Sequence, residues 1–172
     1  MANYRLQDVS QLLDRNVFVD ANILIYLFWP TGSHRFEQNY ARVFRTLLRQ
    51  GNDLYIDFLV ISEVINRVLR IEHSKLNSNI NFKTFRDSQD GKDALDDIHT
   101  IIKGNILNCF NIEGKIFNNQ ELENLMVIND LDFVDKATVS LCSEKSLVLL
   151  TNDGDFKNTG LDILTGNPRI LN

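Results

Sequence analysis

Two short apolar runs that each lead into an aspartate constrain the fold of this chain more than any other feature. Residues 17–19 come directly before Asp20, and residues 147–150 come directly before Thr151-Asn152-Asp153. Runs this short and this apolar are typical of strands in a parallel sheet, because helices cover both faces of such a sheet. Open α/β sheets bind ligands beyond the carboxyl ends of their strands, so we expect both aspartates at one crevice.

The expected crevice concentrates negative charge. Neighbouring carboxylates repel one another and shift each other's pKa unless a positive group neutralises them. A hard divalent cation such as Mg²⁺ binds carboxylate oxygens and is the usual solution. The sequence therefore predicts a cation site formed by acids that lie far apart in the chain.

Hydrophobic periodicity predicts strands and helices in alternation within one domain over residues 1–172. Further strands are expected at 54–56 and 161–164. Helical spacing predicts a lead-in within residues 1–15 and helices over 23–28, 33–50, 60–69, 93–108, 121–126 and 132–144. Residues 72–92 are rich in Asn, Ser, Lys and Asp without clear periodicity, and we interpret them as a polar excursion between helices.

Length and composition restrict the class of protein. The 172 residues suffice for one domain with a sizeable core, and 44% of them are hydrophobic. The net charge of −5 argues against a purely electrostatic nucleic-acid binder, but it is compatible with a carboxylate site that a metal neutralises. Two widely separated cysteines indicate a reduced, cytoplasmic setting, and no apolar run approaches the ~20 residues of a membrane span.

Four acids are candidates for the site, namely Asp20, Glu63, Asp135 and Asp153. Each also has an ordinary structural interpretation. Asp20 and Asp135 suit the beginnings of helices, where they would cap the helix or complement its dipole. Glu63 could pair with Arg67 one turn later, and Asp153 suits a turn. Their joint placement favours a site, because two follow strands, one starts a helix beside the second strand and one lies on the helix after the middle strand.

Four motifs in the chain resemble those of the PIN-domain nucleases. They are Val-Asp-Ala-Asn-Ile-Leu at 19–24, Ser62-Glu63-Val64, Phe-Val-Asp-Lys-Ala at 133–137 and Thr-Asn-Asp-Gly-Asp-Phe at 151–156. Their order and approximate spacing fit the family, and the resemblance spans about residues 16–165. It implies a three-layer α/β/α sandwich with a central, mainly parallel sheet.

The resemblance also implies an Mg²⁺- or Mn²⁺-dependent endoribonuclease that hydrolyses RNA phosphodiester bonds. Carried over by position, the catalytic and metal-binding acids are Asp20, Glu63, Asp135 and Asp153, with Asp155 as a further metal ligand and Asp132 as a rival of Asp135. Asn22 and Thr151 would hold carboxylates or water by hydrogen bonds from outside the ligand set. A toxin role is common in the family and implies an antitoxin partner and often a homodimer. The length of residues 72–125 keeps an RNA-processing enzyme without an antitoxin open as well.

Basic residues provide candidate contacts for RNA. They are Arg42, Arg45 and Arg49 on one predicted helix, and Lys83 and Arg86 beside two phenylalanines in the polar excursion. Cations with neighbouring aromatic rings suit a single strand, through phosphate contact and base stacking. We prefer the alternative for these residues, a solvated helix face and a loop packed by the phenylalanines, because charged runs are usually solvated.

Two other classes of protein remain open. A phosphatase of the haloacid-dehalogenase type also begins with an aspartate after its first strand. Its motif needs a second aspartate two residues later as general acid, where this chain has Asn22. A non-catalytic α/β binding module would use the acids only as caps and turns, and it would not bind a metal through them.

Overall fold

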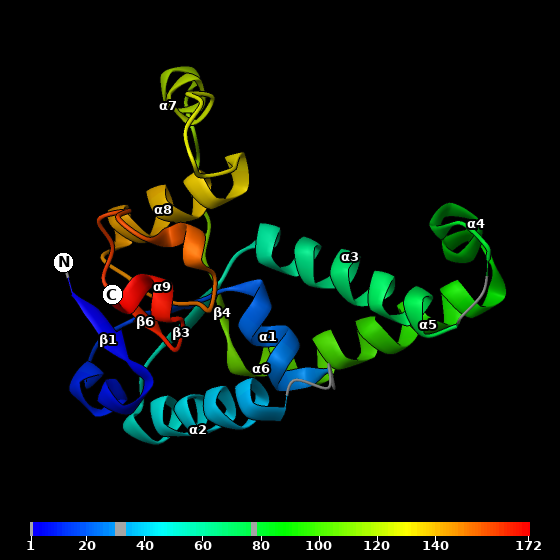
Figure 1. Ribbon diagram of the computed structural model, residues 1–172, viewed down its shortest axis with the longest axis horizontal. Helices are drawn as coiled ribbons and strands as arrows, with labels where there is room; N and C mark the ends of the chain where they lie inside the picture. Colours follow the sequence, from blue (N-terminus) through cyan, green and yellow to red (C-terminus); the bar gives the residue numbers. More distant parts are fainter. Residues whose placement is uncertain (1, 30–33, 77–78) are drawn as a thin grey trace.

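The computed structural model of the chain describes residues 2–29, 34–76 and 79–172 (Figure 1). These residues form a six-stranded sheet in the order β1-β6-β5-β2-β3-β4, with parallel pairing throughout. The strands are β1 (Asn3–Arg5), β2 (Val17–Val19), β3 (Leu54–Ile56), β4 (Asn111–Ile112), β5 (Val148–Leu150) and β6 (Ile163–Thr165).

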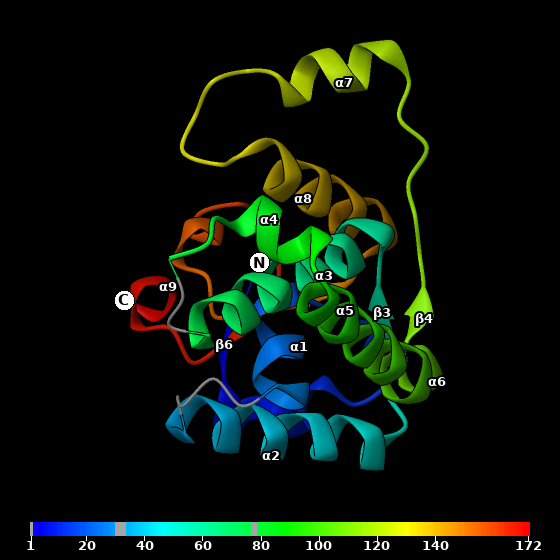
Figure 2. The ribbon, with the colours of Figure 1, turned by 90° about the vertical axis from the view of Figure 1, so that its right-hand side faces the viewer.

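Helices cover both faces of the sheet and make three layers (Figures 1 and 2). On one face lies α8 (Phe133–Lys145), and on the other lie α1 (Ala21–Phe28) and α2 (His34–Gln50). This confirms the predicted three-layer α/β/α sandwich with a parallel central sheet. The other helical segments are η1 (Leu6–Leu12), α3 (Phe58–Lys75), α4 (Phe82–Asp87), α5 (Gln89–Ile101), η2 (Ile102–Ile106), α6 (Leu107–Cys109), α7 (Asn119–Leu125), η3 (Gly154–Phe156) and α9 (Pro168–Leu171).

The apolar runs of the sequence occupy the middle of the sheet. Every residue of β2, β5 and β6 is buried, as expected for strands covered on both faces. Burial of a large apolar side chain such as Phe18, which is fully buried here, contributes about 1.5–3 kcal/mol. The central strands therefore hold the sheet together and fix the positions of the residues that follow them.

Most predicted elements are confirmed, and the differences lie at the edges of the sheet. The strand at 54–56 is β3, the last two strands are β5 and β6, and the helix over 33–50 is α2, although residue 33 lies outside the described residues. The predicted helical lead-in is η1, and the helix predicted at 121–126 is α7. The structure adds β1 and β4 as edge strands that the sequence did not predict. Neither strand contains a buried residue, so neither leaves an apolar run in the sequence.

Most of the described residues in the stretch 72–92 are helical, and residues 77–78 lie outside the described part of the chain. The stretch contains the end of α3, all of α4 and the start of α5, and side chains of Asn81 and Ser88 cap the last two helices. The caps explain why a polar stretch without long apolar periodicity still forms helices. The predicted helix over 93–108 is α5 continued by a π-helical turn, η2, around Gly104.

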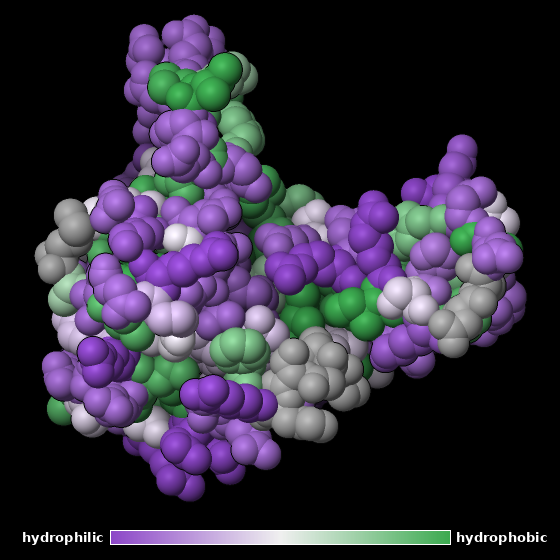
Figure 3. Space-filling model, viewed as in Figure 1, coloured by the Kyte–Doolittle hydropathy of each residue, from purple (hydrophilic) through white to green (hydrophobic). Residues whose placement is uncertain are grey.

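Two parts of the chain project from the sandwich. The first is a helical arm in which α5 returns along α3 with α4 at the tip, and the second carries α7 (Figure 1). In the space-filling view a hollow lies between these projections (Figure 3). None of the helices in the described ranges is long and apolar enough to cross a membrane.

Two lysines tie the α7 projection to the sandwich. The Nζ of Lys136 on α8 donates to the backbone oxygens of Leu125 and Val127, at and just beyond the end of α7. The Nζ of Lys115 lies 2.9 Å from Glu121 of α7 and 2.6 Å from Glu144 of α8. The beginning of α8 is therefore held against α7, which bears on the position of its acids.

The junction of α4 and α5 gives a test of the arm. A Cβ added to Gly91 would lie 2.1 Å from the backbone oxygen of Phe85, so Gly91→Ala should lower the free energy of unfolding by about 1–3 kcal/mol. A Cβ on Gly104 would meet nothing within 4 Å, so Gly104→Ala should be neutral or stabilise by up to ~1 kcal/mol. Urea unfolding and amide hydrogen exchange of the arm would measure both, and equal effects would contradict this packing.

Candidate active site

The chain changes direction across the sheet between β2 and β5. From β2 it proceeds outward to β3 and β4, and it then returns to β5 on the other side of β2. A crevice at such a switch point, beyond the carboxyl ends of the strands, is where open α/β sheets bind ligands. Asp20 follows β2 directly and Thr151 follows β5 directly, so both predicted strand ends meet there.

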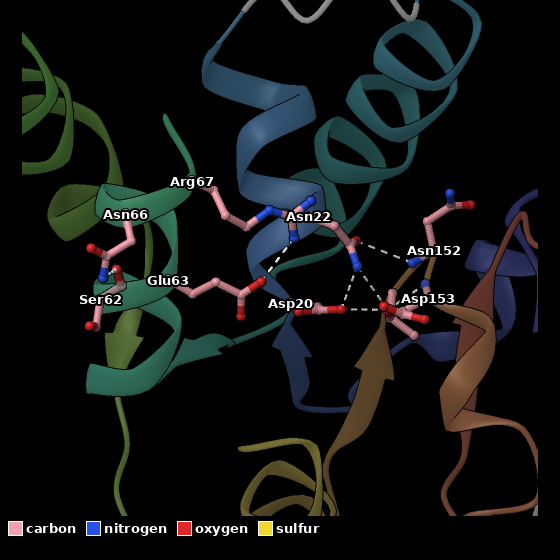
Figure 4. A network of polar contacts seen from close by, with 9 residues as sticks. Asp20, Asn22, Ser62, Glu63, Asn66, Arg67, Asn152 and Asp153 are labelled. Atoms are coloured by element: carbon pink, nitrogen blue, oxygen red, sulfur yellow. Dashed lines mark hydrogen bonds and ion pairs between the residues drawn. The ribbon is translucent and has the colours of Figure 1, made fainter. Parts of the chain in front are cut away.

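Asp20 is held by the two residues that the sequence predicted to support the site. Thr151 Oγ1 donates to Asp20 Oδ2 at 2.6 Å, and Asn22 Nδ2 donates to the same oxygen at 2.6 Å (Figure 4). Asn22 Nδ2 also lies 3.3 Å from Thr151 Oγ1, and Asn22 Oδ1 accepts from the backbone N–H of Asn152. Asp20 precedes α1 as a helix cap would, but its side chain makes no cap hydrogen bond to the helix. Asp20 is the N-cap residue of α1 by position, and its carboxylate is held by Thr151 and Asn22.

The surroundings of Asp20 disfavour its charged form. Burial raises the pKa of Asp20 from 3.8 to about 6, and repulsion from Glu63 and Asp153 adds to the rise. The hydrogen bond from Thr151 acts in the opposite direction and limits this shift of the pKa. Glu63 and Asp153 thus act electrostatically on Asp20, although both lie far from it in the sequence. In Figure 4 the Glu63 side chain extends from α3 toward Asp20.

A second layer of hydrogen bonds fixes the loop after β5. The hydroxyl of Tyr40 donates to Asn152 Oδ1 at 2.8 Å and accepts from the backbone N–H of Gly166 at 3.0 Å. Asn167 Nδ2 donates to the backbone oxygen of Asn152 at 2.6 Å. Asn152 is thereby bound from both sides, which fixes the backbone immediately before Asp153.

Glu63 reaches the crevice from the helix that follows β3. It lies in the first half of α3, and its Oε1 is 2.8 Å from Nη1 of Arg67. The ion pair that the sequence allowed as the ordinary interpretation of Glu63 is thus present. The same carboxylate raises the pKa of Asp20, so pairing with Arg67 and proximity to the crevice occur together.

The beginning of α8 supplies two acids with different surroundings. Asp132 caps the helix, with its Oδ1 accepting from the backbone N–H of Asp135 at 2.8 Å. Asp135 lies deeper, and burial raises its pKa from 3.8 to about 7, with further contributions from the charges of Asp132, Asp20, Asp153 and Glu63. Asp135 is therefore the one whose carboxyl is electrostatically coupled to the acids of the crevice.

An open pocket of about 440 Å³ lies beside these acids. It is bounded by α3, the start of α8 and the loop after β5, and its acidic lining residues are Glu63, Asp132, Asp135, Asp153 and Asp155. Asp153 caps the short helix η3 by accepting from the backbone N–H of Asp155 at 3.1 Å, as turn chemistry predicts. Both residues remain exposed, so their carboxylates stay available on the pocket side.

The basic candidates do not line this pocket in the described part of the chain. Arg42, Arg45 and Arg49 are exposed on α2, and Arg42 borders a separate depression beside η1. Lys83 and Arg86 are exposed on α4 at the tip of the arm, where Arg86 pairs with Asp87 at 3.0 Å. Their contact with RNA stays a prediction.

The donors around the crevice fit a hard divalent cation in chemical type. They are carboxylate oxygens with a neighbouring hydroxyl, which Mg²⁺ and Mn²⁺ prefer over sulfur or imidazole. Among the described residues, no three acidic, histidine or cysteine side chains lie close enough together to hold one metal ion. The acids are therefore gathered in one region and coupled electrostatically, without converging on one point.

The fold and this crevice define a class of protein, a three-layer α/β/α sandwich with an acidic crevice at the switch point of its parallel sheet. The sequence model of the PIN domain matches residues 17–161, so the chain belongs to the PIN domain family. The predicted resemblance is confirmed by this match. Members of the family are generally metal-dependent ribonucleases.

The chain is also similar to a solved structure, PAE2754 from Pyrobaculum aerophilum. The TM-score is 0.51 at 17% sequence identity, over 88% of this chain and 84% of that chain. At this identity the likeness supports the fold alone. A search of curated protein sequences finds no match.

Sequence reasoning missed the residues that position the loop after β5. The spacing of Tyr40 along α2 is that of an apolar residue facing the core, and sequence patterns give no role to Asn152 or Asn167. Tyr40 is indeed buried, and only the contacts of its hydroxyl reveal its second function. A buried tyrosine needs a partner for its hydroxyl, which is the signal that could have pointed to it.

We expect Tyr40→Phe to lower the free energy of unfolding by about 1–3 kcal/mol, because it leaves the polar groups of Asn152 and Gly166 without their partner. The matched control is Tyr55→Phe on β3, since the Tyr55 hydroxyl has no hydrogen-bond partner among the described residues. Chemical denaturation would measure both variants. Similar losses in the two would show that the Tyr40 hydroxyl does not fix the loop.

The raised pKa of Asp135, about 7, predicts how the metal-free protein responds to pH. Between about pH 4 and 7 the folded state binds more protons than the unfolded state, so the free energy of unfolding falls as the pH rises. Asp135→Asn removes this titration. In a chelator, the stability of the variant relative to the parent protein should therefore increase from pH 4 to above 7. A difference that is constant over this range in denaturation curves would contradict the assignment.

Proposed function

We propose that this protein is a divalent-metal-dependent endoribonuclease whose site consists of Asp20, Glu63, Asp135 and Asp153. The observation that supports it is the meeting of these acids, from different parts of the chain, at the switch point of a PIN-family sheet. Each of the other three acids raises the pKa of Asp135, which supports a shared electrostatic environment for the four. A phosphodiester hydrolase needs such a concentration of oxygen ligands.

The four acids would hold Mg²⁺ or Mn²⁺, with Asp155 at the pocket as a further ligand. When bound, the cation lowers the pKa of water and neutralises charge on the phosphate. Asn22 and Thr151 orient the carboxylate of Asp20, and Tyr40 and Asn167 fix the loop that carries Asp153. We choose Asp135 over Asp132, because Asp135 is less exposed and the charges of Asp20, Glu63 and Asp153 all raise its pKa.

The neighbouring pocket is suited to admit a nucleic-acid strand. It is open and is lined mainly by polar side chains, and the hollow between the two projections lies on the same side of the molecule (Figure 3). Metal-dependent cleavage of RNA, the general activity of the family, agrees with this shape. The sequence of the RNA that is cut is a property of contacts outside the acidic site.

The alternative of a haloacid-dehalogenase-type phosphatase has less support. Its general acid would occupy the position of Asn22, whose amide instead donates to Asp20. Membership of the PIN family also favours a nuclease. A phosphatase would release phosphate from small phosphoesters without cutting RNA, and a non-catalytic binding module would do neither.

Within the nuclease function, the toxin of a toxin–antitoxin pair is the narrower role that the family resemblance predicts. Its partners would be an antitoxin protein and a second copy of the chain, and its location would be cytoplasmic. A neighbouring gene whose product suppresses RNA cleavage would support this role. Full cleavage activity in the presence of every neighbouring gene product would favour an RNA-processing enzyme.

The decisive variant for the site is Asp20→Asn. Loss of a residue that supports a metal ligand commonly costs 10–100-fold, so loss of the ligand itself should weaken Mn²⁺ binding and RNA cleavage by more than about 100-fold. Calorimetry with Mn²⁺ and a cleavage assay on defined RNAs, with and without Mn²⁺, would measure this.

Asp97→Asn is the matched control, because Asp97 is exposed on α5. It should retain both properties, and circular dichroism should show both variants folded. Undiminished cleavage by pure, folded Asp20→Asn protein would refute the site.

A further inference from the structure

Glu63 carries its own counter-ion in the absence of a metal. The guanidinium of Arg67, one turn further along α3, lies 2.8 Å from the Glu63 carboxylate. The two side chains are 50% and 38% exposed. Figure 4 shows Arg67 extending from α3 toward α1, over the crevice that contains Asp20. Glu63 lines the acidic pocket, so the guanidinium of Arg67 lies next to a residue of the pocket lining.

Stability is a poor explanation for this pair, because exposed ion pairs one turn apart contribute little to it. The same helix provides a comparison. Lys75 lies 2.8 Å from Glu72, with side chains 50% and 32% exposed. The two pairs agree in length and exposure, but the Lys75 pair lies near the end of α3, in the arm. The Arg67–Glu63 pair therefore differs from the Lys75–Glu72 pair in its surroundings and not in the length of its ion pair.

Those surroundings are strongly acidic. Five carboxylates line the pocket, and its described lining contains no lysine or arginine. An RNA phosphate that enters is repelled by any acid that a metal does not neutralise. A guanidinium at the rim offsets that repulsion, and its planar fork can donate two parallel hydrogen bonds to one phosphate.

We propose that Arg67 is a substrate-binding residue that exchanges Glu63 for a phosphate of the RNA when a divalent cation binds Glu63. The proposal rests on the proposed nuclease function. Cation and guanidinium compete for one carboxylate, so binding of the cation weakens the ion pair. The exchange leaves the positive charge of Arg67 unpaired at the mouth of the pocket, where the phosphate chain enters.

The competition is tested with Mn²⁺ alone. Arg67→Ala should bind Mn²⁺ about 2- to 5-fold more tightly than the parent protein, which is the range expected for release of an exposed ion pair. Lys75→Ala removes the matched pair of the same helix and should leave Mn²⁺ affinity unchanged. Isothermal titration calorimetry gives both values without RNA. Equal or weaker Mn²⁺ binding by Arg67→Ala would overturn the proposal.

The phosphate contact is tested by steady-state cleavage at several salt concentrations. Arg67→Ala should lower kcat/KM by about 10-fold or more, as expected for loss of a charge-assisted hydrogen bond. The slope of log KM against log salt should become shallower by about 0.7, the value for one phosphate contact on a single strand. An unchanged slope would overturn the proposal even if the rate falls.

Different results would refute the nuclease function and the role of Arg67. A parent protein that binds Mn²⁺ through Asp20 but cuts no RNA refutes the nuclease function and, with it, the role of Arg67. A parent protein that cuts RNA, with an Arg67→Ala variant that matches it in Mn²⁺ affinity and salt slope, refutes the role of Arg67 alone.

Discussion

The site depends on the hydrogen bond from Thr151 Oγ1 to Asp20 Oδ2, which spans 2.6 Å and joins residues 131 positions apart. It can form only because β2 and β5 pair in parallel, with Val19 opposite Leu150, so that the two strands end side by side. Asn22 and Asp153 are then placed by the same atoms, since Thr151 Oγ1 accepts from Asn22 and from the Asp153 N–H. One hydroxyl thus links the strand pairing of the fold to the arrangement of the acids.

Concentrating acids in this way has an energetic cost to the metal-free protein. Burial and mutual repulsion raise the pKa of Asp20 to about 6 and that of Asp135 to about 7. The repulsion would fall if the acids moved apart. Hydrogen bonds hold Asp20 in place, however, and the N–H of Asp135 is bound to Asp132. The fold therefore maintains a repulsive arrangement that a cation would relieve, as is common where charge serves binding rather than stability.

The parts of the fold that could be predicted from the sequence are those with a strong local signal. β2 and β5 are continuous apolar runs, and Asp132 stands before a helix as a cap should. The edge strands β1 and β4 contain no buried residue and therefore leave no such pattern. Local sequence patterns also reveal only one of the two roles of some side chains. Tyr40 fits the apolar face of α2, and Arg67 fits an ordinary surface pair with Glu63, because sequence spacing shows neighbours along a helix but not across the crevice.

The choice between Asp132 and Asp135 shows what tertiary structure adds. Both acids open α8, and the sequence could not rank them. Lys136 donates to the carbonyl oxygens of Leu125 and Val127, and so anchors the first turn of α8 to the α7 projection. With the helix anchored and Asp132 engaged as its cap, Asp135 is the acid of this turn whose pKa is raised by Asp20, Glu63 and Asp153. A lysine outside the acidic set thus helps to decide which aspartate belongs to it.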